Sequence, residues 1–295
     1  MITRSTNQTL SIAAQRTLQS NMTRMAALQE KVASQQKITR PSDDPSGTAA
    51  SLKVRAEQAA ADQYGRNIAN GNGWLTTLDT AMSTATGILN RVRDLTIQGA
   101  NDSVPPAARQ AIAVELEGLR ADLLSQANTQ YLGRSVFAGT SDAAGAFTVD
   151  NPPVFTGVPG AAVERRIAPG TTVRVCTDGA AVFGTGTDSV FSLVDSIVAD
   201  LRSGVNVSRH LAAIDARHEV FIGQYADIGT RHAQLLRAEE INMDLSGLLE
   251  AQRSGVEDVD TAQAILDMNL QEVNYRTALA VTAKVLQPTL MDFLR

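Results

Sequence analysis

The strongest constraint on this chain is a heptad pattern of apolar residues in its first third. From Leu75 to Val92 the apolar positions recur at alternating intervals of three and four residues, which is typical of helices that pack along their length. The members are Leu75, Leu78, Met82, Ala85, Leu89 and Val92, and the same phase continues backwards through Gly71, Ile68 and Tyr64. We therefore expect one helix to run through "NGNG" (residues 70–73), although each glycine in a helix interior costs about 1 kcal/mol relative to alanine.

Further helical stripes lie on both sides of the middle of the chain. Their apolar positions are Ile112, Leu116, Leu119 and Leu123 after "NDSVPP"; Val190, Val194, Ile197 and Leu201; Leu211, Ile214, His218, Phe221, Tyr225 and Ile228; and Leu235, Ala238, Leu245, Leu249 and Val256. Aromatic residues make up only 4% of the sequence, so we expect cores built from small and aliphatic side chains. The fold class predicted is mainly α, an elongated antiparallel helical bundle or coiled coil made from both halves of the chain.

A different pattern occupies residues 131–187. Short β-type runs such as "SVFAGT" and "TTVRVCTDG" are bounded there by glycine, proline, asparagine and aspartate, which indicates strands and turns. We expect a small β-rich domain inserted into the bundle. The predicted domains are terminal coiled-coil helices (1–44 plus 256–295), a helical rod domain (45–130 plus 188–255) and a β-rich outer domain (131–187).

The two ends of the chain carry thin apolar stripes and opposite charge. Residues 1–40 are mostly basic and residues 256–295 mostly acidic, which favours pairing of the terminal helices. We expect Leu266, Leu270, Val273, Leu279 and Leu286 to lie opposite Leu18, Met22, Met25 and Val32. Because such thin stripes bury little area in one chain, we expect these helices to be mobile in the free protein and ordered between subunits of an assembly.

The paired carboxylates Asp43 and Asp44 are the most conspicuous candidate for a metal or proton-transfer site. "SDDPSGTAAS" supplies none of the oxygen ligands that a calcium loop places at fixed offsets. Asp44 followed by Pro45 fits instead a helix N-cap with proline at the first helical position. We interpret the two aspartates as helix punctuation.

The remaining residues with reactive side chains form no catalytic pattern. The three histidines lack metal-ligand spacing, Cys176 is the only cysteine, and "FGTGTDS" lacks the lysine of a phosphate loop. We expect no enzyme activity, no metal and no cofactor. A net charge of −5 without a basic run argues against nucleic acid as a partner. There is neither an apolar run of about 20 residues for a membrane helix nor a secretory signal core.

Several motifs resemble proteins of the flagellin family. "KVASQQKITRPSDDPSGTA" resembles the segment that follows the family's first helix, typically "SSGkrI…DDPaG". The matching residues are Lys37, Ile38, Pro41, Asp43, Asp44, Pro45 and Gly47, whereas Ser34, Gln35 and Gln36 replace the usual Ser-Ser-Gly. "ANTQYLGRSVFAGTSD" is similar to another family signature, and the last residues, from "DVDTAQAILDMNL" to "DFLR", resemble the family's closing helix. Together the similarities cover all but parts of residues 143–187.

The resemblance implies a role in assembly. "ILNRVRDLTIQGAN" is similar to the helix with which flagellins pack between subunits, which marks Leu89, Arg91, Val92 and Leu95 as interface residues. "PSDDP", "QYGRNI", "VFAGT" and "DFLR" indicate the hook-associated branch of the family, which joins hook and filament, rather than flagellin itself. The partners implied are further copies of the chain in a ring, a neighbouring hook-associated protein, flagellin and an export chaperone. The location implied is the extracellular flagellum, reached through type III export without a cleaved signal peptide.

Two alternatives remain open from the sequence. The chain could be a flagellin, the filament subunit of the same family. It could also be a secreted helical effector or enzyme, which would require a convergent polar site in residues 131–187, with Arg165, Arg166 and Asp178 as candidates.

Overall fold

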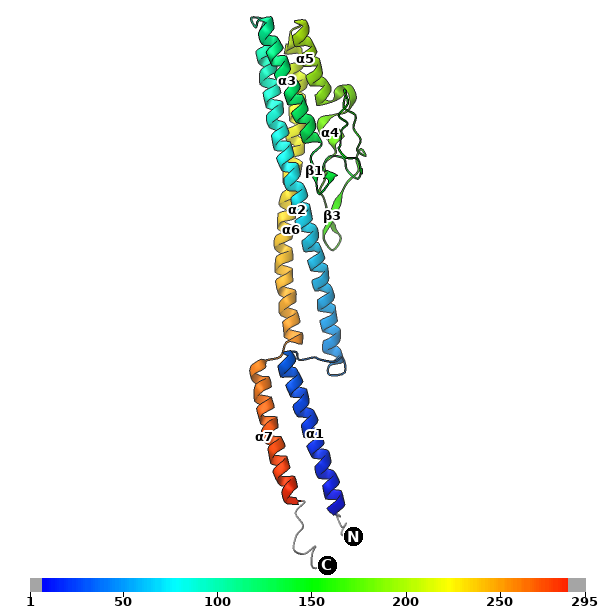
Figure 1. The fold of residues 1–295 in the computed structure, drawn as a ribbon, viewed down its shortest axis with the longest axis vertical. Helices are drawn as coiled ribbons and strands as arrows, with labels where there is room; N and C mark the ends of the chain where they lie inside the picture. The colour runs from blue at the N-terminus through cyan, green and yellow to red at the C-terminus, as the bar shows by residue number, and fades with distance from the viewer. Residues whose placement is uncertain (1–6, 286–295) are drawn as a thin grey trace, which may run out of the picture. The chain divides into compact units, whose positions relative to one another are not determined.

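The structure is a computed structural model that describes residues 7–285. The chain divides into two compact units. The terminal unit contains residues 1–59 and 246–295, and the central unit contains residues 60–245. Helices dominate both units (Figure 1), which confirms the predicted fold class.

The long helix α2 (Pro45–Gly99) begins where the sequence predicts. Asp44 Oδ1 accepts a hydrogen bond from the backbone N of Gly47 at 2.9 Å and so satisfies one of the free amides of the first turn. Pro45 is the first helical residue, where its missing N–H removes no helical hydrogen bond. The predicted N-cap is confirmed.

The same helix runs without a break through "NGNG", as predicted. A Cβ on Gly71 would lie 3.1 Å from Leu235 Cδ1 and 3.3 Å from Val175 Cγ1, and a Cβ on Gly73 would overlap the Tyr131 hydroxyl. The two glycines therefore allow other parts of the central unit to approach the backbone of α2 closely. This close packing accounts for residues that disfavour a helix by propensity alone.

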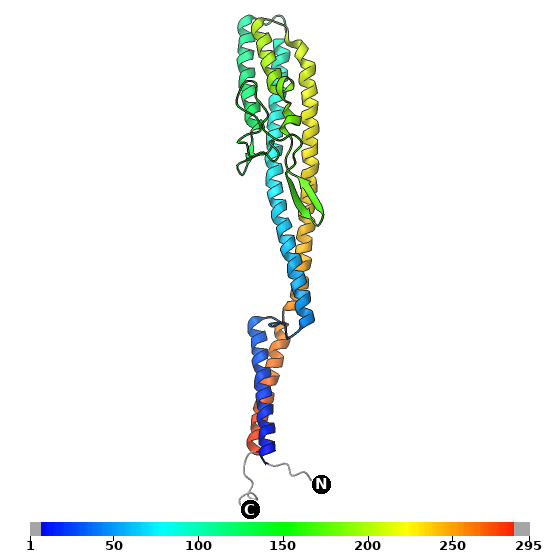
Figure 2. The same ribbon diagram turned by 90° about the vertical axis from the view of Figure 1, so that its right-hand side faces the viewer.

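In the central unit, α2 packs with α3 (Pro106–Ala127), α5 (Val190–Ser203) and α6 (Leu211–Glu257) around an apolar core (Figures 1 and 2). The stripes predicted for these helices supply most of the residues that the four helices contribute to that core. The side chain of Ser189 caps the start of α5 by accepting from the backbone N of Ser192 at 3.1 Å. Gly204 ends α5 in the left-handed conformation, with φ of 77°, as is common at helix C-termini.

Between α3 and α5, where a small β-rich domain is expected from the sequence, the chain forms two small antiparallel sheets. β1 (Gln130–Tyr131) pairs with β2 (Arg134–Ser135), and β3 (Glu164–Ala168) pairs with β4 (Thr171–Arg174). The short helices α4 (Gly179–Phe183), η1 (Gly186–Asp188) and η2 (Val207–His210) complete the central unit. Much of residues 131–187 has irregular backbone that is held by turns and bridges.

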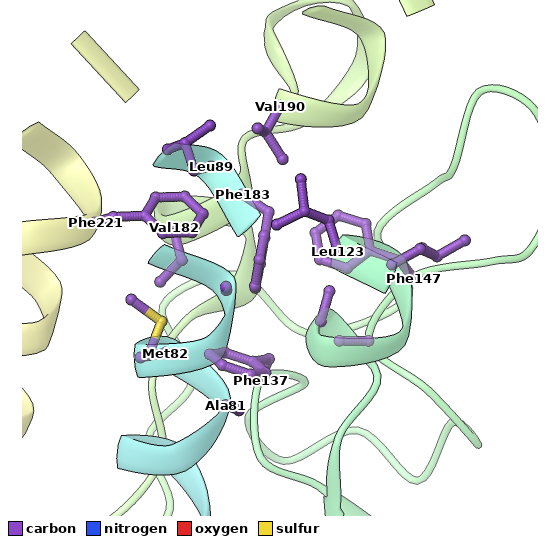
Figure 3. Packing of buried hydrophobic residues seen from close by; sticks show 14 of the residues in the cluster. Ala81, Met82, Leu89, Leu123, Phe137, Phe147, Val182, Phe183, Val190 and Phe221 are labelled. Carbon is purple, nitrogen blue, oxygen red and sulfur yellow. The ribbon is translucent and has the colours of Figure 1, made fainter. Parts of the chain in front are cut away.

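Phenylalanines join this insert to the helices in one core (Figure 3). The ring of Phe183 lies at the centre, with centroid distances of 5.2 Å to Phe137, 5.8 Å to Phe147 and 5.4 Å to Phe221. All three contacts are edge-to-face, the favourable arrangement for aromatic pairs. The phenylalanines of the described residues are thus concentrated where the insert meets the bundle.

In the terminal unit, α1 (Asn7–Ser34) packs along α7 (Thr261–Val285) in the antiparallel direction (Figures 1 and 2). This confirms that the two terminal helices pair. Asp260 caps α7 by accepting from the backbone N of Ala262 at 3.0 Å and of Gln263 at 3.1 Å.

Candidate assembly surface

The contact between α1 and α7 differs from the predicted one on the α7 side. Ala264 is buried, and Gln271, Tyr275 and Ala278 are half-buried on the same face of α7. Gln271 Nε2 donates to the backbone O of Asn21 at 3.3 Å. Because Gln271 and Tyr275 lie on it, the face toward α1 is semipolar rather than leucine-rich.

The predicted α1 stripe is largely on the contact side. Leu18, Met25 and Val32 are half-buried, whereas Met22 is 57% exposed. Leu266, Leu270, Val273 and Leu279 do not lie opposite these residues, and the expectation that they do is wrong. Leu286, the fifth predicted residue, lies outside the described residues.

The leucine-rich side of α7 is open instead. Leu266, Leu270 and Val273 are 53–60% exposed, and their spacing of four and three residues places them on one face. We call these three residues the α7 outer stripe. Ile265, Leu279 and Val281 are also exposed on this helix. A row of large apolar side chains that none of the described residues covers is typical of a surface that binds another protein.

The second predicted group of interface residues lies in the core. Leu89 and Val92 are fully buried and Leu95 is 2% exposed, because their heptad positions face the interior of the central bundle. Arg91 is on the surface, where Nη2 lies 2.6 Å from Glu115 Oε1 on α3. The structure corrects the expectation that the three apolar residues contact another subunit: they stabilise the folded chain.

A charged cluster lies beside the two segments that connect the terminal helices to the rest of the chain. Glu257, at the end of α6, is the only charged residue among the buried residues of the described chain. Arg55 on α2 donates from Nε to Oε1 at 2.6 Å and from Nη2 to Oε2 at 2.8 Å. The Ser51 hydroxyl donates to Oε1, and Arg253 Nη1 lies 3.2 Å from Oε2. We call Glu257, Arg55, Ser51 and Arg253 the Glu257 cluster.

These donors hold the Glu257 carboxyl in its charged form. The hydrogen bonds from Arg55, followed by those from Ser51 and Arg253, lower its pKa from 4.5 to about 2, although burial opposes the shift. The carboxylate therefore stays ionised at neutral pH. No sequence motif predicts this cluster, because Arg55 and Glu257 lie far apart in the chain; the only local signal is the helical spacing of Arg253 and Glu257.

The Asp43–Asp44 pair has local structural roles. Asp43 Oδ2 accepts from the Thr39 hydroxyl and from the backbone N of Arg40, both at 3.0 Å. The Thr39 bond is the main cause that lowers the pKa of Asp43, and the backbone N–H of Gly47 is the main cause for Asp44. Among residues 7–285 no group of His, Cys, Asp and Glu side chains has the arrangement of a metal site.

The candidates for a polar site in the insert also have structural partners. Arg165 Nε donates to Asn70 Oδ1 at 2.8 Å, and the Arg165 guanidinium lies 5.8 Å from the centre of the Trp74 ring. Asp178 caps α4 and accepts from the backbone N of Gly160 at 2.9 Å. Cys176 is buried with a free thiol. In the described part of the chain, none of the helices is both long and apolar enough to cross a membrane.

Comparison with known proteins agrees with the resemblance. Residues 5–142 match the family described as bacterial flagellin N-terminal helical region. The flagellar filament 33 kDa core protein of Treponema phagedenis is 26% identical over 94% of this chain and 93% of its own length. Flagellar hook-associated protein 3 of Salmonella typhimurium is 23% identical over 83% of this chain and 85% of its own length.

A solved structure shows the same fold. The structure of a putative flagellar hook-associated protein from Vibrio parahaemolyticus superposes with a TM-score of 0.67 at 24% identity, over 73% of this chain and 100% of that one. The chain is thus similar to flagellin-family proteins, and the similarity to the family's N-terminal helical region covers residues 5–142. Its fold is the one found in that putative flagellar hook-associated protein. The resemblance stated from the sequence motifs is confirmed.

Proposed function

We propose that this chain joins the hook side of a bacterial flagellum to the filament, as one of a ring of identical subunits. The hook-associated fold and the relative named hook-associated protein 3 support this assignment. The motifs "PSDDP", "QYGRNI", "VFAGT" and "DFLR" favour the same branch of the family. The domain organisation predicted from the sequence, with terminal helices, a helical rod domain and a β-rich outer part, belongs to this proposal.

The α7 outer stripe is the observation that carries the proposal. Leu266, Leu270 and Val273 are more than half exposed although α7 already packs on α1. Covering the exposed part of such side chains stabilises a contact by about 1 kcal/mol each. The exposed apolar surface runs along one face of α7, a shape that a second helix can cover. We therefore infer that the terminal helices of neighbouring subunits cover one another's stripes and become fully ordered on assembly.

The partners and the location follow from that role. The ring contacts further copies of the chain, a neighbouring hook-associated protein on one side and flagellin on the other. An export chaperone holds the chain before secretion, and the chain leaves the cell through the type III export channel without a cleaved signal peptide. The proposed role is structural and involves no reaction and no cofactor.

Leu270→Asp tests the proposal. A charge in the middle of the α7 outer stripe desolvates on burial, so cells that carry this variant should shed filament subunits and keep bare hooks, whereas the purified protein keeps its helicity. Leu132→Asp is the matched control, because Leu132 is 77% exposed in the β1–β2 turn and its φ of 50° suits aspartate. Filaments that remain attached on Leu270→Asp cells would contradict the proposal.

A role as filament subunit is the second candidate. The filament core protein of Treponema phagedenis matches nearly the whole chain, which favours this alternative. Deletion separates the two roles. Loss of a junction protein leaves hooks and releases filament subunits into the medium, whereas loss of the filament subunit leaves the junction in place.

A further inference from the structure

A buried carboxylate holds together four segments of the terminal unit. The Glu257 side chain, 5% exposed, accepts hydrogen bonds from Ser51 and Arg55 on α2. Arg253, one turn earlier on α6, bonds to it and also to Asp258 in the connector before α7, at 3.3 Å. The backbone O of Glu257 accepts from the backbone N of Lys37 in the connector after α1, at 2.6 Å.

The two connectors are also bonded to each other at this point. The backbone N of Val259 donates to the O of Gln35 at 3.0 Å, and Gln36 forms an antiparallel bridge with Asp258. Gln35 has a φ of 57°, a left-handed conformation that is uncommon for a residue other than glycine and that persists where the surroundings hold it. The position of each connector therefore depends on the other and on Glu257.

Stability alone does not explain a charge at this place. Removing two charges from water costs about as much as their attraction returns, and apolar residues of similar volume often stabilise a fold as well or better. What a buried ion pair with several donors does provide is one defined arrangement, because a shifted helix would leave the charge without its partners. Glu257 has this property with respect to α2, α6 and both connectors.

We propose that the Glu257 cluster is a positioning device: it fixes both connectors and thereby the start of α7, the helix that carries the α7 outer stripe. This proposal makes two claims. The first, that the cluster restrains the connectors, concerns the free protein. The second, that this restraint supports assembly through the α7 outer stripe, rests on the proposed function, and the two claims are therefore measured separately.

Limited trypsin digestion of the full chain measures the restraint. Trypsin cuts after Lys37, whose backbone N is bonded to Glu257. Glu257→Gln keeps the shape of the side chain but places an amide against the donors of Arg55. The masses of the two fragments identify cleavage between Lys37 and Ile38. The rate of this cleavage should rise about tenfold in Glu257→Gln, because losing a hydrogen bond to a charged group makes opening of the connector that much more frequent. Circular dichroism should show unchanged helicity.

Glu250→Gln is the matched control. Glu250 lies two turns before Glu257 on α6, also binds Arg253 and is 58% exposed, so its loss should leave cleavage after Lys37 unchanged. Ser51→Ala removes a single donor to Glu257 and should give a smaller increase. If Glu257→Gln lowers the helicity, cleavage of Ser51→Ala decides whether the cluster restrains the connectors. Wild-type cleavage in both Glu257→Gln and Ser51→Ala would overturn the device.

Filament attachment measures the effect of the Glu257 cluster on assembly. Cells that carry Glu257→Gln should keep fewer filaments than cells that carry Glu250→Gln. Faster cleavage together with normal attachment would overturn the link between the cluster and assembly. If instead Leu270→Asp cells keep their filaments, the proposed function is wrong. The cleavage experiment still tests the restraint on the connectors in the free protein.

Discussion

The hydroxyl of Tyr131 occupies the place where a side chain on Gly73 would begin. Tyr131 belongs to β1, and its ring also contacts the ring of Trp74 edge-on, with centroids 5.7 Å apart. The insert therefore rests directly on the backbone of α2, and the glycine of "NGNG" is required by this contact.

Gly73→Ala should consequently lower the stability of the central unit. Overpacking typically costs about 1–3 kcal/mol, which outweighs the gain in helix propensity of about 1 kcal/mol. Chemical denaturation measures the change. Gly87→Ala is the control on the same helix, because a Cβ there meets nothing within 4 Å, and it should be neutral or stabilising. In a Tyr131→Ala background Gly73→Ala should lose its cost; an undiminished cost would show that the contact is not the cause.

Stability should depend on the protonation of Glu257. The pKa of its carboxyl is about 2 in the folded chain and near 4.5 when unperturbed, so the stabilisation is complete above about pH 5 and is lost as the pH falls toward 2. The loss is on the order of 3 kcal/mol at most. Urea denaturation between pH 7 and pH 3 should show a shallower decline for Glu257→Gln than for the wild type. Parallel curves would contradict this assignment.

Asp44 should act as a helix cap and not as a metal ligand. Asp44→Ala removes the acceptor for the backbone N of Gly47, so hydrogen exchange of the first amides of α2 should become faster. Asp44→Ser should restore most of the protection, because serine is also a good N-cap. Calcium and EDTA should leave the melting temperature of the wild type unchanged, and a calcium-dependent shift that Asp44→Ala abolishes would favour a metal site.

The sequence predicted the helices well because their signals are local. Apolar spacing defines α2 through "NGNG", and the dipeptide Asp44-Pro45 marks its start. The spacing of apolar residues does not show whether a stripe faces the core of the chain or its surface. Leu89 and Leu270 belong to equally regular stripes, yet one is fully buried and the other 56% exposed, because this depends on which other helices are present.

Long-range polar contacts could not be predicted from the sequence for a different reason. Arg55 and Glu257 come together only because the start of α2 and the end of α6 lie side by side, next to connectors that are bonded to each other. Neither residue stands in a recognisable motif. The pairing of α1 with α7 was predicted correctly, but Ala264, Gln271 and Tyr275, rather than the leucines of α7, lie on the face toward α1.

The position of the chain in the flagellum tests the central claim most directly. Val149 is 86% exposed in the insert and the single cysteine, Cys176, is buried, so Val149→Cys offers one accessible site for a gold label. Electron microscopy of labelled flagella should show gold only at the boundary between hook and filament. Gold distributed along the filament would contradict the junction role and identify the chain as a filament subunit.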